Sequence, residues 1–164
     1  MRLDTLEDLY TERLRDARGA SEQLRAILPD LAAAVSDGAL AEALADGLHP
    51  IGSSLAALDG IARRHDEPAE AGASDGMAAL VSEARRGALE APFGEAATRD
   101  ALIVMHYDRL SQHVASGYAS LGALAERLRL RDDAAALRAC RDDVSGDARP
   151  ITHLATGATR PEDI

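Results

Sequence analysis

Residues 6–31 read LEDLYTERLRDARGASEQLRAILPDL, and this stretch decides the fold class. Its apolar residues recur every three or four positions, which places them on one face of an α-helix. They are Leu6, Leu9, Tyr10, Leu14, Ala17, Leu24, Ile27, Leu28 and Leu31. Acidic residues occupy the first turn, where the helix dipole favours negative charge. The pattern predicts a long helix from Asp4 to about Val35, bent near Pro29.

The same apolar spacing returns after a short break at 36–38. Asp37 is the predicted N-cap of a second helix, which we expect to run to about His65. Residues 66–76 are polar, contain Gly and Pro, and show no periodicity, so they are predicted to be a linker. A short helix is expected next, at about 77–89.

Two further long helices complete the pattern. The third is expected to span about 95–130, because its apolar residues keep one face for some seven turns. The fourth begins after Arg131, and we expect Gly146 and Pro150 to interrupt it, since both disfavour a helix interior.

Four long amphipathic helices, in two hairpins joined by a crossover that contains a short helix, predict an all-α, ferritin-like four-helix bundle. The bundle is expected to occupy residues 1–156, and residues 157–164 are expected to form a frayed C-terminal tail. The chain has one Phe, three Tyr and no Trp. Its core must therefore be built from Leu, Ala, Val and Ile, which favours closely packed helices.

The composition argues against several functions. A formal net charge of -10 disfavours nucleic acids and anionic membranes, because phosphate binding needs clustered positive charge. All 18 basic residues are arginine, so a lysine Schiff base is excluded. Cys140 stands alone and cannot form an intrachain disulfide. Apolar runs are too short to cross a bilayer and no signal peptide is evident, so a cytoplasmic protein is expected.

Several segments, among them LEDLY at 6–10, MAALV at 77–81 and LAERL at 124–128, follow the pattern of a known family. In these residues the chain resembles the YciE/YciF family of ferritin-like bacterial stress proteins, and the resemblance covers nearly the whole chain. It implies a cytoplasmic homodimer of bundles, a metal centre between the helices and a role in stress tolerance.

The chain departs from this family at the metal centre. Taken helix by helix, the family's ligand positions fall at Ser21, at Pro50 and Ser54, at 111–114 (Ser-Gln-His-Val), and at Asp143, Val144 and Ala148. Only Asp143 keeps an acid. A di-iron site needs about four carboxylates and two nitrogens, commonly as Glu-x-x-His, and the chain contains no such motif. The departures imply a member with a degenerate di-iron site.

Histidines offer an alternative metal centre. His49, His106, His113 and His153 lie on the second, third and fourth long helices. A site of His49, His113 and His153 with Asp143 would suit zinc, iron or another transition metal. No two of them have the i, i+3 or i, i+4 spacing of a helical metal motif. We therefore favour the interpretation that they are exposed or core histidines without a metal.

Small or helix-breaking residues gather in the middle of all four long helices, at 19–21, 47–54, 116–117 and 145–150. Inside a helix, a Pro lowers helix stability by about 3 kcal/mol and a Gly by about 1 kcal/mol. Their presence in the middle of the helices therefore indicates either close contact between helices or room for a ligand. We favour close contact, in which small side chains fill the space that metal ligands would occupy. The alternative is a small-ligand carrier with a central cavity.

The serines beside His113, and Cys140 near His153, lack the strained turn or oxyanion hole that a hydrolase needs. The acidic pairs at 132–133 and 142–143 alternate with arginines and are interpreted as a solvated helix with ion pairs. The sequence thus favours a non-enzymatic bundle, and the family resemblance implies that it is a homodimer.

Overall fold

The computed structural model of the chain describes residues 4–67, 72 and 74–155, and the side chains of all of these except 147–150 and 152–155. The predicted tail at 157–164 lies outside this range. The described residues form helices and no strand. The elements are α1 (Leu6–Ala34), α2 (Gly38–Asp46), α3 (Leu48–Arg64), α4 (Asp75–Ala84), the π-helical segment η1 (Arg85–Glu90), α5 (Ala96–Arg127) and α6 (Arg131–Ala155).

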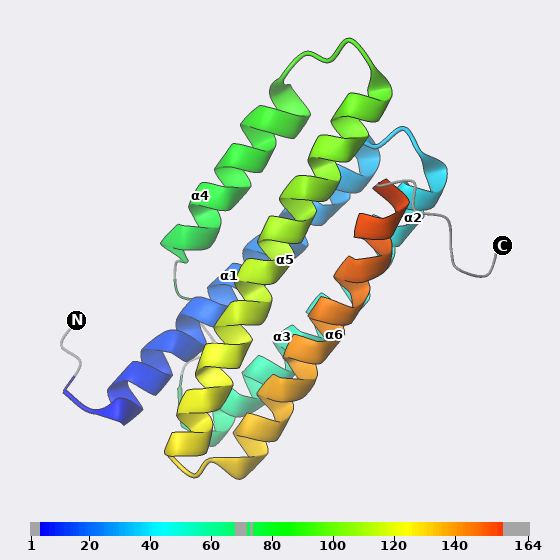
Figure 1. The fold of residues 1–164 in the computed structure, drawn as a ribbon. Helices are drawn as coiled ribbons and strands as arrows, with labels where there is room; N and C mark the ends of the chain where they lie inside the picture. Colours follow the sequence, from blue (N-terminus) through cyan, green and yellow to red (C-terminus); the bar gives the residue numbers. More distant parts are fainter. Residues whose placement is uncertain (1–3, 68–71, 73, 156–164) are drawn as a thin grey trace, which may run out of the picture.

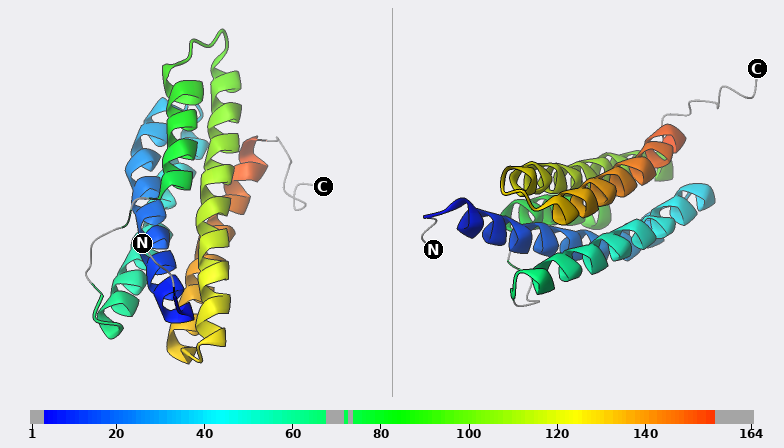
Figure 2. Two further views of the ribbon diagram at one scale, coloured as in Figure 1. Left: turned by 90° about the vertical axis from the view of Figure 1, so that its left-hand side faces the viewer. Right: turned by 90° about the horizontal axis from the view of Figure 1, so that it is seen from below.

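Four long helical rods run side by side, namely α1, α2 with α3, α5, and α6 (Figure 1). α1 packs against α3 and α5, and α6 completes the bundle by packing against α5 and α3. The crossover helix α4 contacts α1 and α5, and the left view of Figure 2 shows it beside them on the near side of the bundle. The predicted all-α bundle with a short crossover helix is therefore confirmed.

The second rod is divided in two, where the sequence predicted one helix. α2 ends at Asp46, and α3 begins at Leu48, after Gly47. Pro50 gives the physical reason, because a proline ring clashes with the carbonyl of the residue four positions earlier, which is Asp46. Within the first turn of α3 the missing N–H of Pro50 is harmless.

Side-chain caps fix where the first two helices begin. Thr5 and Asp8 form a capping box at the start of α1. The side chain of Asp37 accepts a hydrogen bond from Leu40 N at 2.9 Å, which confirms it as the N-cap of α2. The carboxylate of Asp100 on α5 accepts bonds from the backbone N–H groups of Ser36 and Asp37 and so holds this turn against the third rod.

Two other boundaries differ from the prediction. The crossover helix begins two residues early, at Asp75, and its last part is the π-helical η1. The predicted interruption of the fourth helix is wrong, since α6 continues past Gly146 and Pro150. Val144 and Ile151, on either side of these residues, are buried. Burying them stabilises the continuous helix enough to offset the low propensity of the breakers.

Gly72, which precedes α4, lies unusually close to α1. A Cβ atom placed on Gly19 would lie 1.9 Å from the carbonyl oxygen of Gly72. The N–H of Gly72 donates to the carbonyl oxygen of Arg15 at 3.2 Å. Only glycine at position 19 allows this approach of two backbones. No helix in the described part of the chain is long and apolar enough to span a membrane.

Candidate functional site

Four of the ligand positions that the family resemblance implies face the interior of the bundle. Ser21 on α1, Ser54 on α3, Ser111 on α5 and Val144 on α6 are each at most 2% exposed. A side chain at any of them points inward, as the metal ligands of a four-helix bundle must. Three of the four carry a hydroxyl group and the fourth is aliphatic.

A hydrogen bond crosses the bundle from Ser21 to Tyr118 of α5. The two oxygens are 2.6 Å apart. The Ser21 hydroxyl donates its single hydrogen to the carbonyl oxygen of Ala17 at 2.7 Å, so the Tyr118 hydroxyl must donate to Ser21. Burial raises the pKa of Tyr118 to about 12. Tyr118 is therefore a neutral donor at physiological pH.

Ser54 and Cys140 lie beside the same tyrosine. The Ser54 hydroxyl lies near the Tyr118 hydroxyl and the Cys140 thiol and acts to lower the pKa of both groups. It makes no hydrogen bond of good geometry. Burial nevertheless raises the pKa of the Cys140 thiol, which stays protonated. We call Ser21, Ser54, Tyr118 and Cys140 the central cluster. It joins all four rods and carries no charge.

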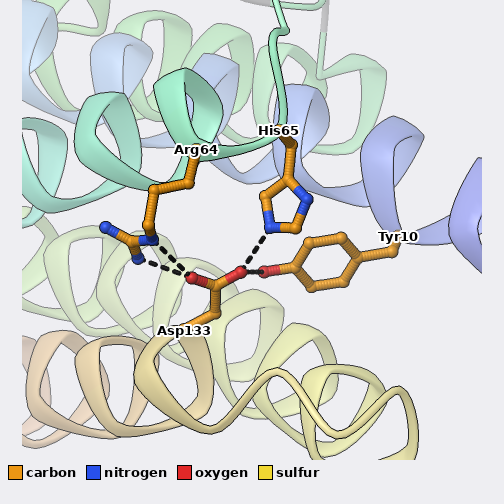
Figure 3. A network of polar contacts seen from close by, with 4 residues as sticks. All are labelled: Tyr10, Arg64, His65 and Asp133. Atoms are coloured by element: carbon orange, nitrogen blue, oxygen red, sulfur yellow. Dashed lines mark hydrogen bonds and ion pairs between the residues drawn. The ribbon is translucent and has the colours of Figure 1, made fainter.

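A second buried polar group lies at the end of the bundle where α5 turns into α6 (Figure 3). Asp133 is 2% exposed. Its Oδ1 accepts hydrogen bonds from Arg64 Nε and Nη2 at 3.0 and 2.5 Å. Its Oδ2 accepts a bond from the Tyr10 hydroxyl at 2.9 Å and lies 2.6 Å from Nε2 of His65. We call these four residues the Asp133 network.

The Asp133 network connects three rods. Burial raises the pKa of Asp133, but the hydrogen bonds from His65, Arg64 and Tyr10 outweigh burial and hold this pKa below its usual value. The position of Asp133 in the first turn of α6 also favours its charge. The Tyr10 and His65 rings pack edge to face, with centroids 5.4 Å apart. Asp133 thus fastens the start of α6 to α1 and to the end of α3.

A family model described as a domain of unknown function (DUF892) matches residues 5–162, almost the whole chain. The chain belongs to the DUF892 family. No curated protein matches it with significance.

Two solved structures share the fold of this DUF892 chain. The E. coli stress protein YciF is 23% identical, with a TM-score of 0.86, over 94% of this chain and 97% of the other. YcfI from Rhodopseudomonas palustris, described as a candidate structural protein, is 22% identical, with a TM-score of 0.85, over 90% of this chain and 93% of the other. The bundle is thus YciF-like, which confirms the predicted family resemblance and the ferritin-like fold.

The residues at the centre of this DUF892 chain do not fit a di-iron site. Two hard cations need several carboxylate oxygens, and the buried positions offer hydroxyls, a phenol and a protonated thiol. Asp143, the one acid that the resemblance retains, is exposed, while its neighbour Val144 faces the core. Pro50 is only half-buried, and the Ala148 side chain lies outside the described residues.

Two histidines of α5 face the crossover. A Cβ atom on Gly76 of α4 would lie 3.1 Å from Cε1 of His113. One on Gly87 of η1 would lie 3.2 Å from Nε2 of His106, whose pKa is lowered by burial. Glycines at 76 and 87 therefore give the two imidazole rings room beneath the crossover segment.

Two of the remaining members of the alternative metal centre lie at the surface. His49 and Asp143 are exposed on α3 and α6. Among the described side chains, no three His, Cys, Asp or Glu residues gather closely enough to hold a metal ion. The side chain of His153 lies outside the described residues, so the four-residue centre stays a prediction.

The sequence interpretation missed the Asp133 network, because it assigned 132–133 to a solvated helix face. That assignment is wrong for Asp133, which is buried and paired. The signal was present in the helical spacing, since Asp133 precedes the buried Leu137, Cys140 and Val144 by four, seven and eleven positions. Those intervals place it on the apolar stripe.

Proposed function

We propose that this chain is a non-enzymatic, ferritin-like structural protein with a stress-related role, in which packing has replaced the metal centre. The Ser21 to Tyr118 hydrogen bond is the observation that carries the proposal, because it occupies the level of the family's ligand positions. An uncharged, close-packed centre supplies no electron-transfer or oxygen-binding group. The described relatives, a stress protein and a candidate structural protein, support this role.

The test is the metal content of untagged protein purified without chelators. After anaerobic addition of Fe(II) and dialysis, we expect far less than one iron, manganese or zinc ion per chain by mass spectrometry. The spectrum should also lack the charge-transfer absorption of a ferric centre. Near-stoichiometric iron retained by the protein would contradict the proposal.

The same experiment examines the alternative centre. If the wild-type protein retains zinc or iron and the histidines are its ligands, the variant His113→Ala/His153→Ala should lose the metal. His106→Ala serves as the matched control, because His106 lies on the same helix but is not a member of that site. Retention of metal by both variants would exclude the histidine centre.

We propose in addition that the protein is a cytoplasmic homodimer, as the family resemblance implies. Light scattering coupled to gel filtration should give twice the mass of one chain across the concentrations tested. A mass equal to one chain would contradict the dimer without affecting the proposal for the bundle centre.

A further inference from the structure

The turn between α5 and α6 presents two exposed arginines that have no ion-pair partner among the described residues. Arg129 and Arg131 lie on either side of Leu130, and both side chains are exposed. They border a hollow of about 470 Å³ that is also lined by Arg64, His65, Asp132 and Asp133. A second hollow, of about 480 Å³, shares the two arginines and is bordered by the Arg138 to Glu126 ion pair.

The charges in the first hollow favour an anion. Arg64 and Asp133 neutralise each other within the Asp133 network. The charge of the exposed Asp132 is then set against those of Arg129 and Arg131, which leaves one positive charge in excess. This excess stands out on a chain with a formal net charge of -10, since most of the surface repels anions.

The backbone of Arg129 gives an independent reason to assign a function to its side chain. Its φ angle is 62°, in the left-handed region that glycine prefers. The N–H of Leu130 bonds to Ala125 O and that of Arg129 to Glu126 O, which is the Schellman pattern at the end of α5. Glycine would suit this position better, and strained positions cluster at functional sites.

We propose that this hollow binds a small, phosphate-bearing anion between the guanidinium groups of Arg129 and Arg131. Guanidinium groups match the geometry of phosphate oxygens and donate two hydrogen bonds at once. Two of them, flanking one turn and without an ion-pair partner among the described residues, suit an anion that can accept hydrogen bonds from both.

Calorimetric titration with sodium pyrophosphate, in a buffer of low ionic strength, tests the proposal. We expect saturable binding, weakened at least tenfold in Arg129→Gly/Arg131→Ala. The control Arg25→Ala/Arg86→Ala removes the same charge from two exposed arginines on α1 and η1 that have no ion pair among the described residues. Its affinity should change less than twofold, which separates a site from general electrostatics.

A stability measurement separates ligand binding from a structural role. Glycine suits the left-handed backbone at position 129, so Arg129→Gly should melt at a higher temperature than the wild type while binding pyrophosphate more weakly. Absence of saturable binding by the wild type, or equal weakening in the two double variants, would overturn the proposal. Cosedimentation with phosphatidylglycerol vesicles without pyrophosphate binding would overturn it as well, in favour of a membrane surface.

Discussion

The phenol oxygen of Tyr118 lies 2.6 Å from Oγ of Ser21, although the two residues are 97 positions apart. Tyr118 is on α5 and Ser21 is on α1, and both are fully buried. Their hydrogen bond joins two rods inside the bundle. The bundle centre is therefore fastened by neutral groups.

The coupling between these residues can be measured. We expect Ser21→Ala to destabilise the protein by about 2 kcal/mol, because it leaves the buried Tyr118 hydroxyl without its acceptor. Tyr118→Phe should cost about 1 kcal/mol, since Ser21 keeps its bond to Ala17. The double variant should cost little more than Ser21→Ala alone in urea titrations. Strict additivity would show that the bond contributes nothing.

Alkaline pH should weaken the fold through Tyr118. Burial raises its pKa from 10.0 to about 12 in the folded state. A tyrosine whose pKa is raised by folding stabilises the folded state, and this stabilisation is fully present below the unfolded-state pKa. It is lost as the pH rises from about 10 to about 12. The loss should be on the order of 2 kcal/mol. Burial and the hydrogen bond to Asp133 also raise the pKa of Tyr10. Tyr118→Phe should therefore flatten the stability curve in this window and leave only the slope that Tyr10 contributes.

Asp133 should matter far more than the acid beside it. Asp133→Asn removes the buried charge and replaces one of the two acceptor oxygens that serve Tyr10, Arg64 and His65 by an NH2 donor, and should destabilise the fold by about 2 kcal/mol. We set the loss at this level because the Arg64 side chain is 47% exposed and its charge stays partly hydrated. Asp132→Asn, at an exposed position, should be nearly neutral in the same urea titration. Equal effects would contradict the network.

Acid should remove the contribution of Asp133. Its pKa is lowered in the folded state from the ordinary value of 3.8 by the bonds from His65, Arg64 and Tyr10, against the effect of burial. A carboxyl group whose pKa is lowered by folding stabilises the folded state at pH values above its unfolded-state pKa. This stabilisation is lost as the pH falls through the folded-state pKa. Stability should thus fall more steeply below about pH 4 in the wild type than in Asp133→Asn, by circular dichroism.

Two glycine to alanine substitutions should change the free energy of unfolding in opposite directions. Gly117→Ala on α5 meets no atom within 4 Å, so it should stabilise the helix by about 1 kcal/mol. Gly19→Ala on α1 places its Cβ 1.9 Å from the Gly72 carbonyl oxygen and should destabilise the protein despite the same gain in propensity. Stabilisation by both would show that Gly72 does not lie against Gly19.

Arg129→Gly should raise the free energy of unfolding by about 1 kcal/mol, because glycine adopts the left-handed conformation without strain. The same change at Arg25, inside α1, should lower it by about 1 kcal/mol. Thermal melts of the two variants, compared with the wild type, show whether each substitution raises or lowers stability. Destabilisation by Arg129→Gly would mean that the side chain has a structural role.

The outline of the fold was predictable because it depends on local pattern. The apolar spacing predicted the long helices to within a few residues, and Asp37 was correctly identified as an N-cap. The break at Gly47 was missed because the apolar stripe runs across it, although Pro50 was a sufficient signal. The continuity of α6 could not be read locally, since burial on both sides of Gly146 and Pro150 outweighs their propensities.

The sequence by itself determined that the chain is an all-helical bundle, because helical periodicity is a local property of the chain. The metal-ligand positions that the family resemblance implies stay a prediction. Tertiary structure alone decided which groups meet. It paired Tyr118 with Ser21 and buried Asp133 against Tyr10 and Arg64. Such contacts depend on how the helices rotate and align against one another, which helical spacing within one segment leaves undetermined.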